Sequence, residues 1–138
     1  MEYSKEYTVR DEHIDVQGIM DGLYYPFYME YCRHQYIDEI LGFNLESEAR
    51  NGVNMVLSVY TINFLRSLKK DDIFIVTCKL FRDKSNGAKL HFRQEIILNK
   101  KLVTKAIFTG TCVSSTGGRP FIPESIKSSI GNAPVLED

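Results

Sequence analysis

The sequence predicts an α+β domain in which one antiparallel sheet wraps around one long central helix. Three observations lead to this prediction. An aromatic-rich helical pattern covers residues 24–41, four runs rich in β-branched and aromatic residues follow it, and the links between those runs are short. Because the helical segment is apolar around most of its circumference, the sheet has to curl around the helix to bury it.

The bulk properties favour a single soluble domain over residues 1–138, with 43% hydrophobic and 25% charged residues. A net charge of −1 without a basic block argues against a nucleic-acid partner. No apolar run approaches the roughly 20 residues of a membrane span. The first residues do not resemble a signal peptide, and the three cysteines are widely spaced. We therefore expect a cytoplasmic protein with no metal site, no cofactor and no membrane contact.

The first elements are a strand and the helix. Glu6–His13 is expected to form the first strand. Asp21 is the expected helix N-cap, and Pro26 falls in the first turn, where proline is tolerated. The helix is expected to run from Tyr24 to Leu41 and to stop at Gly42.

The four later runs are expected to be strands, and the links between them resemble turns. Short links between long strands predict an antiparallel meander. The expected strands are Met55–Phe64, Ile73–Phe81, Lys89–Leu98 and Leu102–Val113, joined by Lys69–Asp72, Lys84–Gly87 and Asn99–Lys101.

Alternation along the third of these strands separates a core face from a second face. The second face is expected to be solvated in part or shared with a partner. The chain after Gly131 is expected to be frayed. The core-facing residues are Leu90, Phe92, Gln94, Ile96 and Leu98, and the residues on the other face are His91, Arg93 and Glu95.

The stretch from Asp15 to Arg33 is the most informative for function. Asp15 lies in a loop punctuated by Gly18 and Gly22, directly before the helix. A helix N-terminus collects free backbone N–H groups and the positive end of the helix dipole. A carboxylate that can attack or activate water, beside N–H donors that can hold an oxyanion, is the minimum equipment for acyl transfer.

Two motifs stand out along the chain. The first consists of Asp15, Gly18, Ile19, Tyr25, Glu30 and Arg33, and the second of Thr116–Pro120 with Ile122 and Pro123. On these residues the chain resembles, over nearly its whole length, the hot-dog fold acyl-CoA thioesterases of the 4-hydroxybenzoyl-CoA thioesterase type. It differs from many relatives at Ile19–Gly22, where Asp21 and Gly22 are unusual, and this difference bears on the substrate class.

The resemblance implies hydrolysis of an acyl-CoA or acyl-carrier thioester. It implies Asp15 as nucleophile or general base and the Gly22 amide as the group that polarises the carbonyl. The alternatives are a turn-capping aspartate and a conformational glycine. Gln17 would orient Asp15 or a water molecule. Gly18 and Ile19 are assigned to the substrate site with Tyr25, which would contact the acyl group unless it is simply a core residue.

Basic residues near the turn at residues 86–87 are implied to hold the phosphates of coenzyme A. These are Arg82, Lys84 and Lys89, with Arg93 nearby. A second cluster, Arg66, Lys69 and Lys70, competes for this role, and an ordinary solvated hairpin is the structural alternative. Glu30 and Arg33 are read as a local helix pair.

Two rival functions and an assembly complete the expectations. A hydratase or dehydratase of hydroxyacyl thioesters is one rival, and a non-catalytic acyl-CoA-binding module is the other. No pair of histidines has metal-ligand spacing, and no serine-hydrolase or phosphate-loop motif is present. One sheet wrapped on one helix leaves an open strand edge, and relatives pair two sheets edge to edge, so a homodimer or homotetramer is expected.

Overall fold

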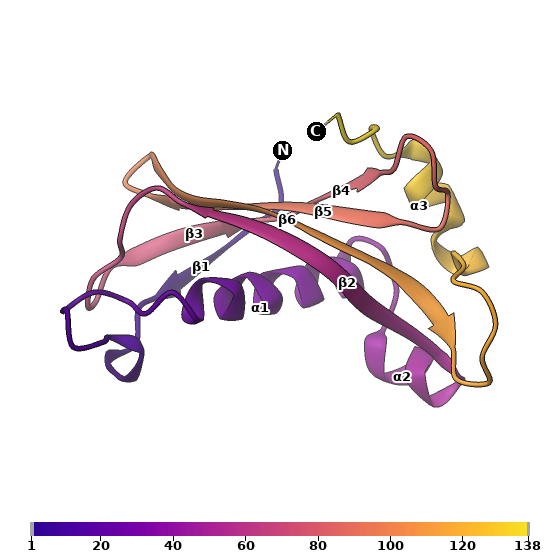
Figure 1. Ribbon diagram of the computed structural model, residues 1–138, viewed down its shortest axis with the longest axis horizontal. Helices are drawn as coiled ribbons and strands as arrows, with labels where there is room; N and C mark the ends of the chain where they lie inside the picture. The colour runs from indigo at the N-terminus through magenta and orange to yellow at the C-terminus, as the bar shows by residue number, and fades with distance from the viewer. Residues whose placement is uncertain (1, 138) are drawn as a thin grey trace.

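The computed structural model of the protein describes residues 2–137, and its strands form one six-stranded antiparallel sheet. The helix α1 (Tyr24–Glu39) lies along one face of this sheet (Figure 1). This architecture confirms the predicted fold class. The strands are β1 (Ser4–Thr8), β2 (Val53–Phe64), β3 (Ile73–Thr77), β4 (Lys79–Arg82), β5 (Leu90–Leu98) and β6 (Lys101–Ser114).

The order of the strands departs from the predicted meander. The sheet order is β1-β3-β5-β6-β2, with β4 also paired to β5, so β2 and β3 are not neighbours. The eight-residue link 65–72 crosses the end of the sheet instead of forming a hairpin. Eight extended residues span roughly 26 Å, which exceeds the three strand spacings of about 5 Å each that separate β2 from β3. A link that reads as a turn is therefore long enough to be a crossover.

Two predicted strands are shorter or divided. The first strand ends at Thr8, and a single 3₁₀ turn occupies Asp11–His13, where the sequence predicted more strand. The predicted strand Ile73–Phe81 is interrupted at Cys78, whose N–H donates to the carbonyl of Tyr3 at 3.2 Å. Both pieces keep one register on β5, with Val76 opposite Ile96 and Lys79 opposite Arg93, so β4 continues the line of β3.

The helix α1 matches its prediction apart from its ends. It runs from Tyr24 to Glu39, and Gly42 adopts a positive φ of 67° just beyond it, as expected for a helix stop. The expected N-cap is displaced, because Leu23 occupies that position. The Asp21 carboxylate instead accepts the Leu23 N–H at 2.9 Å, and the Asp21 carbonyl accepts the Tyr24 N–H at 3.0 Å.

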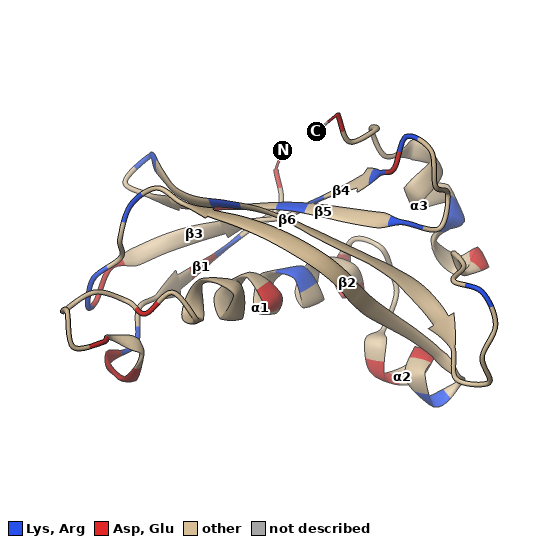
Figure 2. Ribbon diagram, viewed as in Figure 1, with Lys and Arg blue, Asp and Glu red and all other residues tan. Residues whose placement is uncertain are grey.

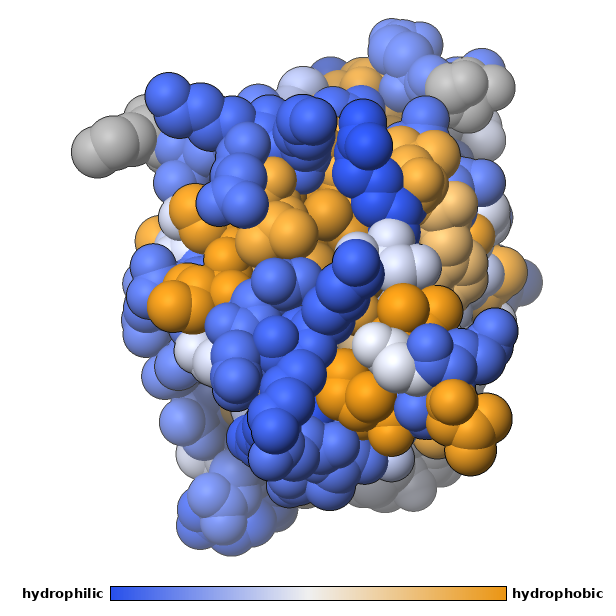
Figure 3. All heavy atoms as spheres, turned by 90° about the vertical axis from the view of Figure 1, so that its left-hand side faces the viewer, coloured by the Kyte–Doolittle hydropathy of each residue, from blue (hydrophilic) through white to orange (hydrophobic). Residues whose placement is uncertain are grey.

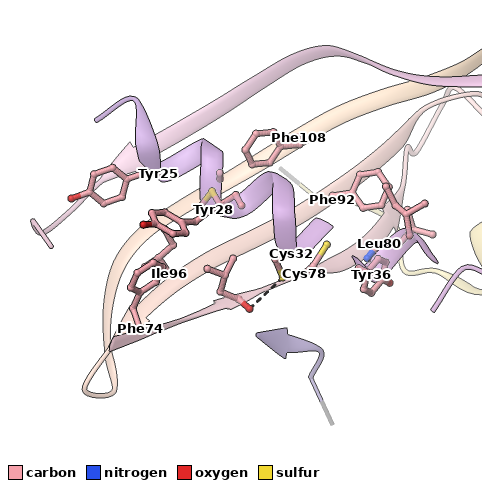
Figure 4. Packing of buried hydrophobic residues seen from close by; sticks show 14 of the residues in the cluster. Tyr25, Tyr28, Cys32, Tyr36, Phe74, Cys78, Leu80, Phe92, Ile96 and Phe108 are labelled. Carbon is pink, nitrogen blue, oxygen red and sulfur yellow. Dashed lines mark hydrogen bonds between the residues drawn. The ribbon is translucent and has the colours of Figure 1, made fainter. Parts of the chain in front are cut away.

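The core lies between α1 and the sheet (Figure 4). Tyrosine hydroxyls of α1 accept backbone N–H groups: Tyr25 from Leu68 at 3.0 Å and Tyr36 from Leu80 at 3.0 Å. These bonds satisfy buried donors and fix the helix against the crossover and against β4. Buried aromatic and aliphatic residues from the sheet fill the space beneath α1, among them Phe74, Phe92, Ile96 and Phe108.

The C-terminal segment is ordered, so the prediction of a frayed end is wrong. A 3₁₀ turn at Glu124–Ile126 leads into α3 (Lys127–Asn132), and the chain then runs beside β4. The Arg82 N–H donates to the Pro134 carbonyl at 2.9 Å, and the Leu136 N–H donates to the Arg82 carbonyl at 2.8 Å. The backbone of this segment is therefore held by the free side of β4. The short helix α2 (Leu45–Arg50) was not predicted.

The strand β2 is an edge with exposed apolar side chains on both of its faces. Val56, Leu57, Val59 and Tyr60 are 40–57% exposed. Its pairing with β6 is interrupted by an irregularity between Leu57 and Val59. An apolar, exposed edge strand is a template for pairing with another chain.

Candidate active site

The loop that carries Asp15 is a small, tightly bonded hairpin. The Asp21 N–H donates to the His13 carbonyl at 2.9 Å, and the Asp15 N–H donates to the Ile19 carbonyl at 2.9 Å. The turn closes when the Gly18 N–H donates to the Asp15 carbonyl at 3.0 Å. Gly18 has a φ of 82°, a conformation that side chains disfavour, so its local role is to form this turn.

The carboxylate of Asp15 is oriented by Gln17. Asp15 Oδ1 accepts the Gln17 backbone N–H at 2.8 Å, and Oδ2 accepts the Gln17 side-chain Nε2 at 3.3 Å. The carboxylate remains partly exposed and Gln17 is exposed. Ile19, opposite Asp15 in the hairpin, is half-buried and supports the loop. The arrangement holds one carboxylate in a fixed direction with access to solvent.

The Gly22 amide lies at the start of α1 and is free to bind an acceptor. Within residues 2–137, the Gly22 N–H donates to no protein acceptor, whereas the neighbouring N–H groups of Asp21 and Leu23 are both bonded. Gly22 does not have a positive φ, and a Cβ at this position would meet only Phe64, at 4.0 Å. The backbone therefore does not require glycine here.

Aromatic side chains brace the start of α1 against the loop. The His13 ring stacks on Tyr24 at a centroid distance of 3.8 Å, and its Nδ1 lies 2.9 Å from the Tyr28 hydroxyl. Tyr25 points into the core, where burial raises the pKa of its hydroxyl and the nearby Asp15 charge adds to the shift. Tyr25 thus links the Asp15 end of the molecule to the crossover through its bond to Leu68.

A cavity of about 320 Å³ opens between α1, β2 and β6, beside Gly22. The two residues after Gly22 contribute to one end of its lining, and Arg33 contributes about two and a half helical turns further on. Most of the lining is aromatic or aliphatic. The lining residues are Leu23, Tyr24, Pro26, Phe27, Glu30, Arg33, Leu57, Tyr60 and Phe108.

Arg33 is buried, which the sequence did not predict. Its side chain is 4% exposed, while that of its helix neighbour Glu30 is 59% exposed, with 3.8 Å between Nη2 and Oε1. Nη1 donates to Oε1 of the fully buried Gln94 at 2.9 Å, and the guanidinium lies 4.2 Å from the Phe108 ring centroid. Burial lowers the pKa of Arg33, which still leaves the guanidinium protonated.

Two signals in the sequence point to this buried pair. Gln94 is polar within an otherwise apolar alternation, and a buried amide needs partners. Arg33 follows Met29 by four residues and precedes Ile37 by four, so it shares the helix face of two buried residues.

The two basic clusters lie at opposite ends of the molecule. The loop with Lys84 and Lys89 is at the right of Figure 2, and the Asp15 loop is at the left of Figure 1. The nine residues of β5 that separate these ends span roughly 30 Å. Arg82 is already engaged, since its Nε donates to the Ala133 carbonyl at 3.0 Å. Within one chain, the cluster of Arg82, Lys84 and Lys89 therefore lies far from Asp15.

The rival cluster is attached directly to the Asp15 hairpin. The Met20 N–H donates to the Leu68 carbonyl at 2.8 Å, within the crossover that carries Arg66, Lys69 and Lys70. Lys70 pairs with Asp11 at 3.6 Å, whereas Arg66 and Lys69 are exposed. Figure 3 faces this end and shows hydrophobic atoms at the surface among hydrophilic ones. Arg66 and Lys69 thus lie at the same end of the molecule as Asp15 and form no ion pair within residues 2–137.

Among residues 2–137 no three His, Cys, Asp or Glu side chains gather closely enough to hold a metal ion. No helix in this range has the length and apolarity needed to span a bilayer. The absence of a metal, the absence of a cofactor and the cytoplasmic location remain predictions.

Residues 9–130 match the sequence profile of the thioesterase-like superfamily. The chain is also similar to the chloroplastic acyl-acyl carrier protein thioesterase ATL3 of Arabidopsis thaliana, with 27% identity over 125 residues. That alignment covers 89% of this chain and 64% of the plant protein, so the chain spans less than two thirds of that relative.

Solved structures share the fold over almost the whole chain. A Staphylococcus aureus protein in complex with CoA superposes with a TM-score of 0.84 at 17% identity, covering 100% of this chain and 89% of that one. A 1,4-dihydroxy-2-naphthoyl-CoA thioesterase from Synechocystis gives 0.81 at 13% identity, with 94% and 96% covered. These similarities establish the hot-dog fold for this chain.

Proposed function

Because this chain belongs to the thioesterase-like superfamily, we propose that it hydrolyses an acyl thioester of coenzyme A, or of an acyl carrier, to a free acid and a thiol. The observation that carries this proposal is the pairing of an oriented carboxylate with a free amide. Asp15 is held by Gln17, and the unbonded Gly22 N–H stands at the start of α1. Gly22 directly precedes Leu23 and Tyr24, which line one end of the aromatic cavity, and the Asp15 hairpin leads into the same helix start.

The general-base route uses these groups as follows. Asp15 takes a proton from a water molecule as the water oxygen adds to the thioester carbonyl. The Gly22 N–H and the positive end of the α1 dipole stabilise the resulting oxyanion. The intermediate then collapses, the C–S bond breaks, and the thiolate takes the proton from Asp15. The product is one carboxylic acid and one thiol for each water molecule consumed.

The nucleophilic route uses the same two residues. Asp15 adds to the carbonyl and expels the thiolate, which leaves a mixed anhydride, and water then hydrolyses the anhydride to restore Asp15. A thioester is sufficiently activated for either route without a serine–histidine pair. The two routes share the oxyanion contact with Gly22, so the choice between them does not affect the assignment of residues.

A second copy of the chain is part of this proposal. The exposed apolar edge of β2 offers unpaired backbone groups and apolar side chains such as Val59 and Tyr60. An antiparallel pairing of two β2 edges about a two-fold axis reverses one protomer relative to the other. This reversal sets the β4–β5 loop of one protomer on the same side as the Asp15 loop of its partner. Lys84 and Lys89 would then hold the phosphates of a substrate whose carbonyl sits in the other subunit.

Both thiol carriers are consistent with the relatives. One structural neighbour is described in complex with CoA, and the plant relative is named an acyl-acyl carrier protein thioesterase. Each carrier ends in a phosphate-linked thiol arm, so either would need cationic residues near the site.

The deciding experiment is turnover with a panel of acyl-CoA thioesters that vary in length and ring content. Release of thiol, followed with a thiol-reactive dye, is the expected result. Loss of enoyl absorbance without thiol release would identify a hydratase. Tight binding without either change would identify a binding module and reject the hydrolase.

A further inference from the structure

The cavity beside Gly22 contains two charged residues in an otherwise mostly apolar lining. Glu30 and Arg33 lie on the same side of α1, and the other lining residues are Leu23, Pro26, Leu57 and aromatic side chains. A pocket of this composition would hold a hydrocarbon without any charged group. The presence of a guanidinium and a carboxylate therefore requires an explanation.

The guanidinium of Arg33 is positioned by two direct contacts, with Gln94 and with Phe108. Gln94 accepts its Nη1, and Gln94 is itself fixed because its Nε2 donates to the Met29 carbonyl at 2.9 Å. The Phe108 ring packs against the guanidinium plane, and Tyr60 stacks on Phe108 at 4.8 Å between centroids. These contacts leave the group little freedom to move towards bulk water.

The protein satisfies only part of this buried cation. A guanidinium has five N–H donors, and within residues 2–137 it donates one hydrogen bond, to Gln94. The ion pair with Glu30 is long at 3.8 Å, and an exposed carboxylate offsets little of the cost of burying a charge. A pair with a purely structural role would be expected to have shorter and more numerous contacts. The unused donors are therefore available to a ligand in the cavity.

We propose that Arg33 and Glu30 select the acyl group, and that they favour an acyl group bearing a hydroxyl over a plain hydrocarbon. This inference rests on the proposed thioester hydrolysis. A hydroxyl can accept from Arg33 and donate to Glu30 at the same time, so it satisfies both charged groups. A carboxylate would be repelled by Glu30, and a methyl group would leave the guanidinium unpaired. A site built to bind a hydroxyl discriminates strongly against the analogue that lacks one.

The geometry also sets where the hydroxyl should lie. Arg33 follows Gly22 by 11 residues, a rise of roughly 16 Å along a helix. A helical side chain leans back towards the helix N-terminus, so the guanidinium lies roughly 10 Å from the oxyanion position. A hydroxyl on the eighth carbon of a straight acyl chain reaches a similar distance. A hydroxyl on the third carbon does not.

The test compares octanoyl-CoA, 3-hydroxyoctanoyl-CoA and 8-hydroxyoctanoyl-CoA. We expect kcat/KM to be about 10- to 100-fold higher for the 8-hydroxy substrate than for octanoyl-CoA, the scale of one hydrogen bond to a charged group. Arg33→Met should abolish this preference, so that within this variant kcat/KM for the 8-hydroxy substrate is no higher than that for octanoyl-CoA. Glu30→Gln, at a position that is 59% exposed, should reduce the preference. Glu39→Gln is the matched control on α1, because Glu39 pairs with Lys5 outside the cavity.

Several outcomes would overturn the proposal. Equal kcat/KM for the three substrates in the unmodified protein would do so. If Arg33→Met lowers kcat/KM equally for all three substrates and the variant is monomeric, Arg33 serves the subunit contact and not the selection of the acyl group. If no thioester is hydrolysed at all, the proposed function fails, and binding of the corresponding non-hydrolysable thioethers by calorimetry tests the selection separately. Retention of the 8-hydroxy preference in Glu30→Gln and Arg33→Met would also reject it.

Discussion

His91 and Asp83 are joined by a distance of 2.8 Å between Nε2 and Oδ1, and this contact fixes the base of the β4–β5 loop. The second carboxylate oxygen of Asp83 accepts the Asn86 N–H at 2.8 Å and the Ser85 N–H at 3.0 Å. The other ring nitrogen of His91 lies 2.8 Å from the Thr109 hydroxyl. The loop that presents Lys84 is thus anchored to β6 through one imidazole.

This anchor predicts a contribution to stability that depends on pH. The bond from His91, followed by the backbone bonds from Ser85 and Asn86, holds the pKa of Asp83 well below its usual range. A lowered folded pKa gives stability that is fully present above about pH 4 and is lost as the pH falls further. Asp83→Asn should therefore lower the free energy of unfolding at pH 7 and flatten its decline in acid. Urea unfolding at pH 7 and pH 3 measures both effects.

Asp38→Asn is the control for this experiment. Asp38 is exposed on α1 and forms no ion pair within residues 2–137. An equal flattening in Asp38→Asn would show that Asp83 has no special part in the acid response.

Asp15→Asn should separate chemistry from folding. The substitution keeps the shape of the loop and removes the charge, so kcat should fall by at least about 100-fold with little change in KM. Thermal unfolding should be nearly unaffected, because within residues 2–137 the side chain accepts hydrogen bonds from Gln17 alone. Steady-state kinetics with any accepted acyl-CoA measures both parameters.

Asp21→Asn is the control. It should lower the free energy of unfolding by about 1 kcal/mol or less and keep activity, because the asparagine side-chain oxygen can accept the same bond from the Leu23 N–H. If Asp15→Asn keeps near-normal turnover while Asp21→Asn or Glu30→Gln loses it, the catalytic role belongs to that other carboxylate and not to Asp15.

Two substitutions at Gly22 distinguish its amide from its flexibility. Gly22→Ala keeps the N–H and meets only ordinary contact with Phe64, so activity should remain within a few-fold of the unmodified protein. Gly22→Pro removes the N–H at a position before α1, where no helical hydrogen bond is lost, and kcat should fall about 100- to 1,000-fold. The two variants are compared only if their circular dichroism spectra match that of the unmodified protein, which shows that the fold is retained. Loss of activity in Gly22→Ala as well would mean that the site needs the absence of a side chain there.

The two basic clusters can be told apart by matched double variants. If the β4–β5 loop holds the CoA phosphates, Lys84→Glu with Lys89→Glu should raise KM and leave kcat largely intact, which is the signature of uniform binding. Arg66→Glu with Lys69→Glu makes the same charge change at the Asp15 end. The reverse pattern, with KM raised only by the crossover variant, would place the phosphates in the same chain as Asp15. Both variants are measured at low ionic strength, where charge effects are largest.

The oligomeric state follows from the exposed edge of β2. At micromolar concentration, light scattering should give at least twice the mass of the 15.9 kDa chain. Val59→Lys places a charge at the centre of this edge, where Val59 is 57% exposed, and should shift the protein towards monomer. Ser4→Lys adds the same charge at an exposed position of the opposite edge strand, β1, and is the matched control. A monomeric unmodified protein would reject the assembly.

The sequence was sufficient for most of the secondary structure and for little of the spatial arrangement. The helix and the alternation on β5 follow from periodicity, which depends only on local geometry. The crossover was missed because the length of link 65–72 permits both a loose turn and a passage across three strand ends. The ordered end near Leu136 was missed because its hydrogen bonds use backbone groups, which leave no pattern in the residue types.

The candidate site shows the same division between local and distant features. The Asp15 hairpin and the start of α1 are local in sequence, so the motif located them together. Burial of Arg33 depends on Gln94, 61 residues away along the chain, and a local helix pair was the simpler interpretation. The proposed approach of Lys84 to Asp15 would require a second chain, which no pattern within a single sequence describes.

If the β4–β5 loop of a partner holds the substrate phosphates, as proposed, the separation of this loop from the Asp15 loop makes hydrolysis depend on an encounter between two chains. A newly made protomer would then have Asp15 at one end and the proposed phosphate-binding lysines at the other, and it would not complete the proposed site alone. At low expression the number of working sites would rise with the square of protomer concentration, by mass action, until the assembly saturates. Dilution would then switch the enzyme off without any change in its fold, and restoring the concentration would switch it on again.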